Sequence, residues 1–439
     1  MKVEMKDSGI AWINKIPTNW DIFNIGSCTT EVNNPNGITG ETNALQFKMG
    51  EIIRKSDGNS KYNPETLEAY NIVDNGVVMI NGLNLSFDLI SQRVGLVKER
   101  GVITSTYIAI RPNENLYPFY FNYLMKAYDN CKAFHAMGRG LRQTLSYGEL
   151  KKHPIIVPPF QLQQQIANFL DDKCADIDQL ITLQQQMIEE LKAYKQSVIT
   201  EAVCKGLDKS VPMKDSGIEW IGEVPEGWEI TKLKNVSKLK TGGTPNGYDN
   251  QSDFTTRKPW FTPSDFNENY KLIQSNRFLN LEVIENEKII LFPKHTVLMV
   301  CIGTVGKVGI LTEEGYCNQQ VTAIIPNGRM LPEYILYTLI AENKIIRDLA
   351  NYTILPIINN SFLKEIILVC PTFEEQKNIV AFIEHKSSQI DNLISIKQQK
   401  IDELKEYKKS MIYEYITGKK QVPENNIRPL SNCEAVECD

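Results

Sequence analysis

The amino-acid sequence predicts an α+β fold in which two mixed α/β domains are separated by a long antiparallel two-helix coiled coil, with an internal pseudo-two-fold repeat. Two long polar segments, residues 163–203 and 376–416, align without a gap at an offset of 213 positions. A second pair of segments, MKDSGIAWINKIPTNWDI (5–22) and MKDSGIEWIGEVPEGWEI (213–230), shows that the repeat includes what precedes each helix. Searching for internal repeats therefore fixes the architecture as two copies of one unit.

In both long segments apolar residues recur at alternating steps of three and four, which is the 3.5-residue repeat of a coiled coil. Polar residues interrupt the two seams at matched places, Gln184 with Lys397 and Lys195 with Lys408, and such positions fix register at some cost in stability. Two unrelated surface helices would not be expected to share these interruptions. The residues that we expect to form the interface are Ile177, Ile181, Ile188, Leu191 and Val198 in the first helix and Ile390, Ile394, Ile401, Leu404 and Met411 in the second.

The length of the helices decides how they pair. A helix of about 40 residues is about 60 Å long. The linker to the second copy has only about ten residues and spans at most about 35 Å. Parallel pairing would require the linker to return along the whole helix, whereas antiparallel pairing requires no return path. We therefore expect antiparallel helices that hold two unlike heads apart.

The repeat also gives domain boundaries. Two mixed α/β domains, residues 1–157 and 211–370, are each followed by a spacer helix region, 158–210 and 371–420, and residues 421–439 form a loose tail. We expect strands at Val77–Ile80, Gly95–Val97, Val297–Val300 and Val308–Leu311.

The two domains match in some stretches and not in others. GVITSTYIAIRP (101–112) stands opposite GYCNQQVTAIIP (315–326), and both end on a β-branched segment that predicts a strand. Pro118 and Pro332 then each open a probable helix. Residues 24–70 and 232–290 show no convincing match. A shared scaffold therefore carries two different sets of loops, and since loops carry most binding residues, we expect two different ligands.

Composition limits the class of protein. Hydrophobic residues make up 42% and charged residues 23% of the 439 residues, which is ordinary for a globular protein. We find no apolar run of about 18 residues and no apolar signal core, so we expect a cytoplasmic protein without a membrane span. The nine cysteines form no CxxC pair, which predicts neither a disulfide framework nor a zinc site. The net charge of −5 neither supports nor excludes a polyanionic partner.

No catalytic site emerges from the motifs. Val157-Pro158-Pro159-Phe160 lacks the Asn or Asp of an amino-methylating motif and is better explained as a proline stop before a helix. Gly303–Lys307 (GTVGK) is too short for a phosphate loop, and we interpret it as a hairpin turn. The four histidines lack metal-ligand spacing. We therefore expect no catalytic, cofactor-binding or metal-binding residues in this chain.

Several segments resemble the specificity (S) subunit of type I restriction–modification systems, the HsdS family. The resemblance covers about 5–420 and rests on MKDSGIEWIGEVPEGWE (213–229), TGGTP (241–245), PWFTPSDF (259–266) and GTVGKVGI (303–310), in that order, together with the duplicated helices. One departure is that Leu162 stands where the second copy has Glu375, so that a carboxylate expected to be exposed at the helix start is absent from the first copy.

The resemblance implies a function for each part. The two domains would be target-recognition domains, each reading one half of an asymmetric bipartite site in double-stranded DNA. The paired helices would set the spacing and dock two methyltransferase (modification) subunits, which restriction (translocase–nuclease) subunits join. The chain would not be an enzyme, and S-adenosylmethionine and ATP with Mg²⁺ would be bound by the partner subunits.

Candidate DNA contacts follow from residue chemistry. Lys and Arg neutralise phosphates, whereas amide, guanidinium and hydroxyl groups reach base edges. Each of these side chains could equally be an ordinary surface group, so we rank stretches rather than single residues, and the bases that are read cannot be derived. The candidates in the first domain are Lys48, Arg54, Lys55, Asn59, Lys61, Asn81, Asn84, Lys132, Arg139, Arg142 and Gln143, and those in the second are Thr241, Gly242, Gly243, Thr244, Arg257, Lys258, Trp260, Asn318, Gln319 and Gln320.

Two other functions are compatible with parts of this pattern. A two-headed protein–protein scaffold would use the same spacer without binding DNA. A self-contained modifying enzyme would need cofactor and catalytic motifs, which we do not find.

Overall fold

The computed structural model divides the chain into two compact units. The first unit joins residues 1–184 with 399–439, and the second consists of 185–398. The residues that the structure describes are 4–37, 40–55, 67–87, 91–138, 143–219, 221–245, 257–280, 284–285, 287, 289–349 and 356–423.

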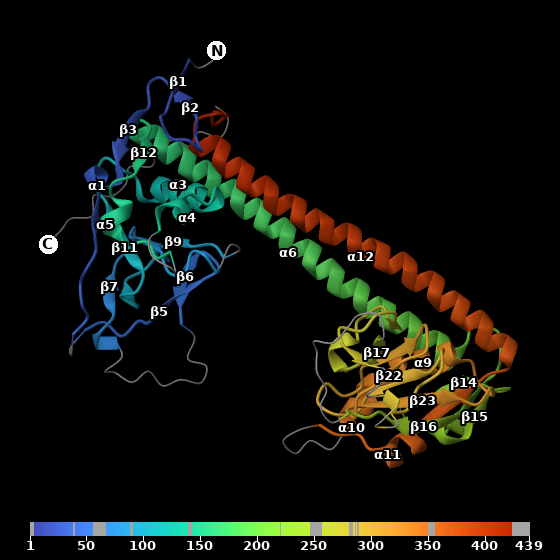
Figure 1. Cartoon of the computed structure of the whole chain (residues 1–439). Helices are drawn as coiled ribbons and strands as arrows, with labels where there is room; N and C mark the ends of the chain where they lie inside the picture. The colour runs from blue at the N-terminus through green and yellow to red at the C-terminus, as the bar shows by residue number, and fades with distance from the viewer. Residues whose placement is uncertain are drawn as a thin grey trace. The chain divides into compact units, whose positions relative to one another are not determined.

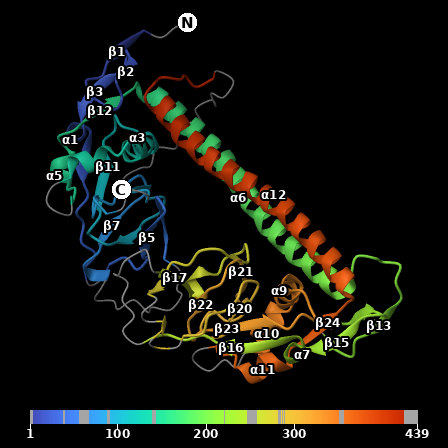
Figure 2. The ribbon, with the colours of Figure 1, turned by 45° about the vertical axis from the view of Figure 1, so that its right-hand side comes forward.

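Each unit contains part of both long helices, α6 (Phe160–Lys205) and α12 (Phe373–Ile416), which run side by side in both views (Figures 1 and 2). In the first unit the beginning of α6 shares a core with the end of α12, where Ile177 lies in one cluster with Met411 and Ile416. In the second unit the end of α6 shares a core with the beginning of α12. The helices are therefore antiparallel within each unit, as the linker length predicted.

The expected interface residues all lie at least partly inside. They divide into a buried set, Ile177, Ile188, Ile390, Ile401 and Met411, and a half-buried set, Ile181, Leu191, Val198, Ile394 and Leu404. Near the end of α6 the buried position is Ile199, which is 1% exposed, and not its neighbour Val198. At this end of α6 the globular part of the second unit covers Ile199, which lies in one core cluster with Ala202 and Trp228.

The first unit is built on a four-stranded antiparallel sheet in the order β4-β11-β8-β9, with helix α3 packed on it (Figure 1). Two further strand pairs, β1-β2 and β3-β12, lead the chain into and out of this sheet. The bounds are β1 Met5–Asp7, β2 Lys15–Pro17, β3 Asp21–Asn24, α1 Ile25–Cys28, β4 Thr29–Glu31, β8 Val78–Ile80, β9 Val94–Leu96, β11 Ile108–Pro112, α3 Pro118–Asn130, α4 Ala133–Met137, α5 Tyr147–Leu150 and β12 Pro154–Val157.

The second unit repeats this plan. Its sheet has the order β16-β23-β20-β21, and β18 joins the edge in parallel. The pairs β13-β14 and β15-β24 correspond to β1-β2 and β3-β12. The bounds are β13 Met213–Asp215, β14 Glu223–Pro225, β15 Glu229–Lys232, α7 Leu233–Val236, β16 Ser237–Thr241, the 3-10 turn η2 Pro263–Asp265, β18 Lys271–Leu272, β20 Val297–Val300, β21 Val308–Leu311, β23 Val321–Pro326, α9 Pro332–Ala341, α10 Asn343–Leu349, α11 Asn360–Glu365 and β24 Ile367–Cys370.

The units differ in the strands added to this plan. The first adds the pairs β5-β6 and β7-β10, whereas the second adds the three-stranded sheet β19-β17-β22. Several of these strands fall within 24–70 or 232–290, the stretches without sequence match. The bounds are β5 Leu45–Lys48, β6 Glu51–Arg54, β7 Asn71–Val73, β10 Gly101–Ile103, β17 Arg257–Phe261, β19 Phe278–Asn280 and β22 Tyr316–Cys317.

The predicted local elements are confirmed where the sequence pattern was strongest. β20 and β21 coincide with the expected strands, and Gly303–Lys307 lies in the turn between them, as the hairpin interpretation required. Pro118 and Pro332 each open their helix, where the missing N–H of proline costs nothing. None of the described helices is long and apolar enough to cross a membrane.

A buried glutamine holds the start of each long helix to its domain. Gln163 is 0% exposed; its Oε1 accepts from the Tyr117 backbone N at 2.8 Å and its Nε2 donates to the Pro158 carbonyl at 2.8 Å. Gln376 is 1% exposed and makes the equivalent bonds with Leu331 and Pro371, at 2.8 and 3.0 Å. Both amides thus satisfy backbone groups that would otherwise be buried without partners.

The carboxylate at the start of α12 is a structural group. Glu375 forms a capping pair with Thr372, whose hydroxyl donates to Oε2 at 2.6 Å, and its Oε1 accepts from Trp228 Nε1 at 3.0 Å. The expectation of an exposed carboxylate at this place is therefore wrong, because the side chain is half-buried and both of its oxygens accept hydrogen bonds within the unit. In the first copy Leu162 is apolar and packs against the core instead.

A glycine ends each helix region against a tryptophan. Gly206 and Gly418 have φ of 72° and 71°, a conformation that side chains other than glycine rarely adopt. A Cβ at either position would lie 3.0 Å from a ring atom of Trp228 or Trp20 respectively. The tryptophan of each globular region thus packs against the end of the helix from the other copy.

Two of the lysines that interrupt the seam, Lys195 and Lys408, each bind an aspartate of the facing helix. Lys195 Nζ lies 2.8 Å from both carboxylate oxygens of Asp391, and Lys408 Nζ lies 2.7 Å from both oxygens of Asp178. In both pairs the residue numbers add up to 586, so one antiparallel register describes both units. A lysine that is largely covered needs such a partner, which favours this register over others.

Candidate nucleic-acid interface

The loops that precede the central strands lie at one edge of each sheet. In an antiparallel sheet the beginning of β11 lies beside the ends of β4 and β8, and the beginning of β23 lies beside the ends of β16 and β20. We call these the first and second sheet edges. Each consists of the loops that follow the two strands flanking the central strand, together with the turn that precedes the central strand.

The second sheet edge brings together two of the predicted stretches. The backbone N of Gly242 donates to the Val321 carbonyl at 3.0 Å, and that of Gly243 donates to the Cys317 carbonyl at 2.9 Å. A Cβ on Gly242 would lie 2.2 Å from the Cys317 carbonyl oxygen, so only glycine permits this approach. At the same edge the Thr244 hydroxyl donates to Gln319 Oε1, which joins the two stretches through their side chains.

Two of the predicted contact residues support this edge from inside. Trp260 is 2% exposed, and its Nε1 donates to the Gly243 carbonyl at 3.1 Å. The ring is therefore not accessible to a ligand. Trp260 supports the second sheet edge from within and does not make the ligand contact that the sequence led us to expect. Asn318 is 7% exposed and is likewise held within the edge. Thr241 at the end of β16 accepts from Asn360 Nδ2 at 2.9 Å, which adds a residue that the sequence did not single out.

The first sheet edge is organised by Arg93, which sequence reasoning missed. This arginine is 2% exposed, and its guanidinium donates to the backbone carbonyls of Asn81, Leu83 and Asn84 at 3.1, 2.8 and 3.4 Å. Its own backbone N donates to Asp129 Oδ2 at 2.8 Å, and burial raises the pKa of that carboxyl. The loop after β8 is therefore shaped from beneath by one buried side chain.

Gln143 joins the same edge through its backbone. Its carbonyl accepts from the Leu85 N at 3.2 Å, and Leu145 N donates to the Gly82 carbonyl at 2.9 Å. The structure thus brings together Asn81, Asn84 and Gln143, which are separated by about 60 residues in the sequence. Such proximity between loops is set by the tertiary fold and has no local sequence signal.

Several of the basic candidates that the structure describes lie on elements outside these edges. Lys48 and Arg54 belong to the β5-β6 hairpin, where Arg54 pairs with Glu99 at 2.8 Å, and Lys258 pairs with Glu314 at 3.2 Å. Lys55 follows this hairpin, Lys132 is the N-cap residue before α4, and Arg257 begins β17. Asn59, Lys61, Arg139 and Arg142 lie outside the described residues.

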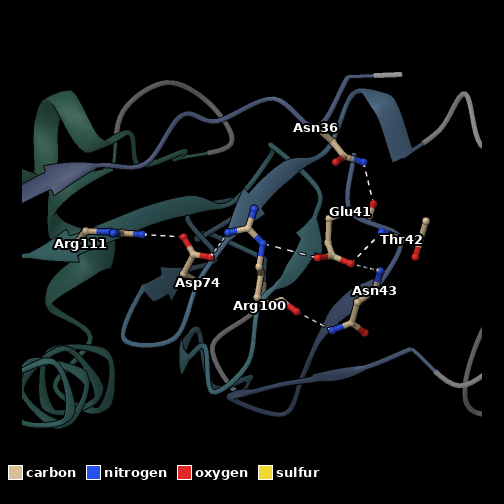
Figure 3. Close-up of polar contacts among 7 residues, drawn as sticks. All are labelled: Asn36, Glu41, Thr42, Asn43, Asp74, Arg100 and Arg111. Atoms are coloured by element: carbon tan, nitrogen blue, oxygen red, sulfur yellow. Dashed lines mark hydrogen bonds and ion pairs between the residues drawn. The ribbon is translucent and has the colours of Figure 1, made fainter. Parts of the chain in front are cut away.

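Two other arginines of the first unit are committed to carboxylates (Figure 3). Arg111 and Arg100 contact the two oxygens of Asp74 at 3.0 and 2.8 Å, and Arg100 also lies 3.6 Å from Glu41. Backbone N–H groups of Asn43 and Thr42 lower the pKa of Glu41, with Arg100 as a further cause. The network fixes the chain between β4 and β5 on the sheet, so these arginines serve the fold.

Among the residues that the structure describes, no three His, Cys, Asp or Glu side chains come together as a metal site. What the two edges present is an array of hydroxyl and amide groups, on loops held by backbone hydrogen bonds. Such groups recognise the donors and acceptors of a ligand and do not by themselves perform acid–base or nucleophilic chemistry.

Comparison with known proteins agrees with this geometry. The Type I restriction modification DNA specificity domain matches the chain twice, over residues 19–193 and 225–406. The chain is 27% identical over 349 residues to the type I restriction enzyme MjaVIII specificity subunit of Methanocaldococcus jannaschii, covering 75% of this chain and 76% of that protein. It is 26% identical over 326 residues to the putative MjaX specificity subunit of the same organism, covering 72% and 71%.

Two solved structures share the fold. One, from work on complex assembly and conformational transition of the type I R-M system, has a TM-score of 0.67 at 14% identity and covers 92% of this chain and 99% of its own. The HsdS subunit of Thermoanaerobacter tengcongensis has a TM-score of 0.50 at 15% identity and covers 92% and 98%. With two matched domains over most of its length, the chain belongs to the family of type I restriction–modification DNA specificity subunits.

Proposed function

We propose that each globular domain reads one half of an asymmetric bipartite site in double-stranded DNA. The observation that carries this proposal is that one sheet scaffold occurs twice, with different loops at the same edge. Identical loops would favour two identical half-sites, whereas the hydroxyl and amide groups at these edges differ between the units. The names of the relatives, which are specificity subunits of restriction enzymes, support a DNA ligand over a purely protein-binding scaffold.

The chemistry of the complex belongs to partner subunits in this proposal. Methyltransferase subunits with S-adenosylmethionine would modify the DNA, and restriction subunits with ATP and Mg²⁺ would translocate and cut it. This chain would act in the cytoplasm, where such a complex meets incoming DNA. Its own contribution is to select the site and to place the partners on it.

A pair of exposed apolar patches supports the docking of two copies of one partner. In the first unit Leu180 and Leu183 of α6 are 46% and 48% exposed, and Tyr407 of α12 is 58% exposed. In the second unit the residues at an offset of 213 are Leu393 and Ile396, 45% and 53% exposed, and Tyr194, 56% exposed. We call these the first and second helix patches.

Within each patch the two helices present the same side of the coiled coil. Relative to the seam, Leu180 and Tyr407 both occupy the g position of the heptad, and Leu183 occupies the adjoining c position. In an antiparallel pair the g positions of both helices flank one side of the interface, so the three side chains share a face. Exposed apolar clusters of this kind mark protein–protein contacts. Two matched clusters fit two identical methyltransferase subunits.

The helices are proposed to set the distance between the half-sites. Inserting one heptad into both, between Gln186 and Met187 and between Gln399 and Lys400, keeps the seam in phase and lengthens the pair by about 10 Å. At 3.4 Å per base pair the gap between half-sites should grow by about three base pairs. An unchanged gap would show that the helices do not measure it.

Binding to DNA is tested with the purified chain and its methyltransferase partner. The complex should bind duplexes carrying one bipartite sequence more tightly than scrambled duplexes at the same salt concentration, because non-specific affinity depends strongly on salt. Leu180→Asp with Leu393→Asp should weaken partner binding, whereas the control pair Gln186→Asp and Gln399→Asp should not. Absence of sequence preference in every mixture would end the proposal.

A further inference from the structure

The turn that precedes the central strand of each sheet has the same construction in both units. Residues 104–106 precede β11 and residues 318–320 precede β23, at an offset of 214. The first turn has the sequence Thr-Ser-Thr and the second Asn-Gln-Gln. Both turns lie in the sheet edges defined above, and each leads into the central strand of the sheet that the two units share.

In the first unit the outer residues of the turn hold each other. The backbone N of Thr106 donates to Thr104 Oγ1 at 3.4 Å, and the two hydroxyl groups lie 2.5 Å apart. Ser105 stands exposed between them. Its hydroxyl is a single group that can both donate and accept.

In the second unit the same bonds are made by amides. The backbone N of Gln320 donates to Asn318 Oδ1 at 3.1 Å, and Asn318 Nδ2 donates to Gln320 Oε1 at 3.0 Å. Gln319 stands exposed between them, in the position of Ser105. The contact from the Thr244 hydroxyl orients its amide, and among the described residues the Gln319 Nε2 donors make no hydrogen bond.

In both turns, therefore, the two outer residues stabilise the backbone, and the middle residue is exposed to solvent. The outer residues keep side chains that close the turn, so the middle residue can change without changing the backbone. At this middle position the units carry a hydroxyl and an amide, which differ in reach and in hydrogen-bonding pattern. A glutamine amide matches the adjacent donor and acceptor of adenine in the major groove, whereas a serine hydroxyl can pair with either partner of several bases.

We infer that Ser105 and Gln319 are equivalent base-contacting residues, one for each half-site, and that the difference between them is one source of the asymmetry of the site. The inference rests on the proposed DNA-binding function and deepens it. It assigns to Gln319 an A·T pair in the half-site of the second domain. It assigns to Ser105 one base pair in the half-site of the first domain.

The test measures binding of the full chain with its methyltransferase partner to duplexes in which each base pair of the site is replaced in turn. Gln319→Ala should reduce discrimination at one A·T position of one half-site, by about 5- to 150-fold. Discrimination at the other half-site should be unchanged. Ser105→Ala should have its effect in the opposite half-site, and Ser105→Gln should shift the preference there towards A·T.

Three comparisons make the result decisive. Gln186→Ala, on the exposed face of α6, should leave all positions unchanged. Gln319→Glu keeps the length of the side chain but removes its donors, so it replaces the alanine variant if that variant melts at a lower temperature. A uniform loss of affinity at every position, or no loss anywhere, overturns the inference, since a phosphate contact would be insensitive to sequence. An unmodified complex without any bipartite preference would instead defeat the proposed function.

Discussion

The two units differ most where their sheets end and least where their helices begin. Both keep the strand order, the buried glutamine at the helix start and the tryptophan packed on the terminal glycine of the opposite helix. They differ in the strands added to the sheet and in the side chains of the edge loops. The comparison teaches that positions joining a domain to the helices are constrained by buried contacts, whereas positions at the edge are constrained only through their backbone.

The largest expected effect breaks one unit and spares the other. Trp20→Ala should lower the free energy of unfolding of the first unit, and Trp228→Ala that of the second, by about 3–5 kcal/mol, because each leaves a cavity in a core. Differential scanning calorimetry should show one transition shifted in each variant. Phe23→Ala, at a side chain that is 44% exposed, is the control with little change. Equal shifts of both transitions would contradict the independence of the two units.

A buried acid distinguishes the units by pH. Glu342 is the C-cap residue of α9, and burial raises its pKa from 4.5 to about 8, whereas Tyr128 stands at the corresponding place in the first unit. A carboxyl with a raised folded-state pKa contributes most stability below its unfolded pKa and loses it as pH rises through the folded pKa. From pH 5 to 9 this carboxyl should therefore lower the stability of the second unit, by on the order of a few kcal/mol.

The control for this pH effect is Glu342→Gln, which keeps the shape of the side chain and cannot ionise. The variant should lose less stability than the unmodified chain as the pH rises from 5 to 9, which thermal melting of the second unit measures. If both chains lose the same stability over this range, the carboxyl is not protonated in the folded state.

An intermediate effect is expected at the start of the long helices. Gln163→Ala and Gln376→Ala each leave a backbone N–H and a carbonyl without their partners, at a cost of about 1–3 kcal/mol. The equivalence of the two bonds predicts similar losses, one in each unit. Urea unfolding monitored separately in each unit measures this, with Gln161→Ala as an exposed control on α6. A loss confined to one variant would show that the joints are not equivalent.

The smallest effect concerns the ion pairs between the helices. Lys195 and Lys408 are 12% and 26% exposed in side-chain area and Asp391 and Asp178 are 44% and 58% exposed, so each pair should contribute about 1 kcal/mol or less. Lys195→Ala should cost this amount, and the exchange of Lys195→Asp with Asp391→Lys should recover part of it. A double-mutant cycle at low and high salt makes the measurement. An exchange that is as damaging as two separate losses would argue against a direct pair.

The sequence predicted the repeat, the antiparallel helices and the strands of the shared sheet because these follow from spacing. Val297–Val300 and Val308–Leu311 are apolar runs that predict buried strands, and the spacing of three and four residues predicts the helix seam. The prediction was less accurate where neighbours decide. Trp260 looked like a surface aromatic beside two basic residues, yet its neighbours in space are Gly243 and a small core.

Arg93 and Glu375 are two further residues whose roles depend on tertiary contacts that the sequence pattern does not show. An arginine before a strand carries no sign that it donates to three carbonyls of the preceding loop, 9 to 12 positions earlier in the chain. Glu375 was expected to be exposed at the helix start, but Trp228, 147 positions away in the chain, donates to one of its carboxylate oxygens. Tertiary polar contacts of this kind have no period, so pattern alone does not reveal them.

The reciprocal bonds between Asp178, Lys195 and their counterparts have a consequence for how such a protein changes over generations. Each copy of the repeat supplies one aspartate and one lysine to the paired helices. One helix is therefore complementary to an antiparallel copy of itself. In a chain that carries two such copies, either globular part could be exchanged without altering these ion pairs. New combinations of domains would then arise by replacing one domain as a module, while the pairing of the helices stayed the same.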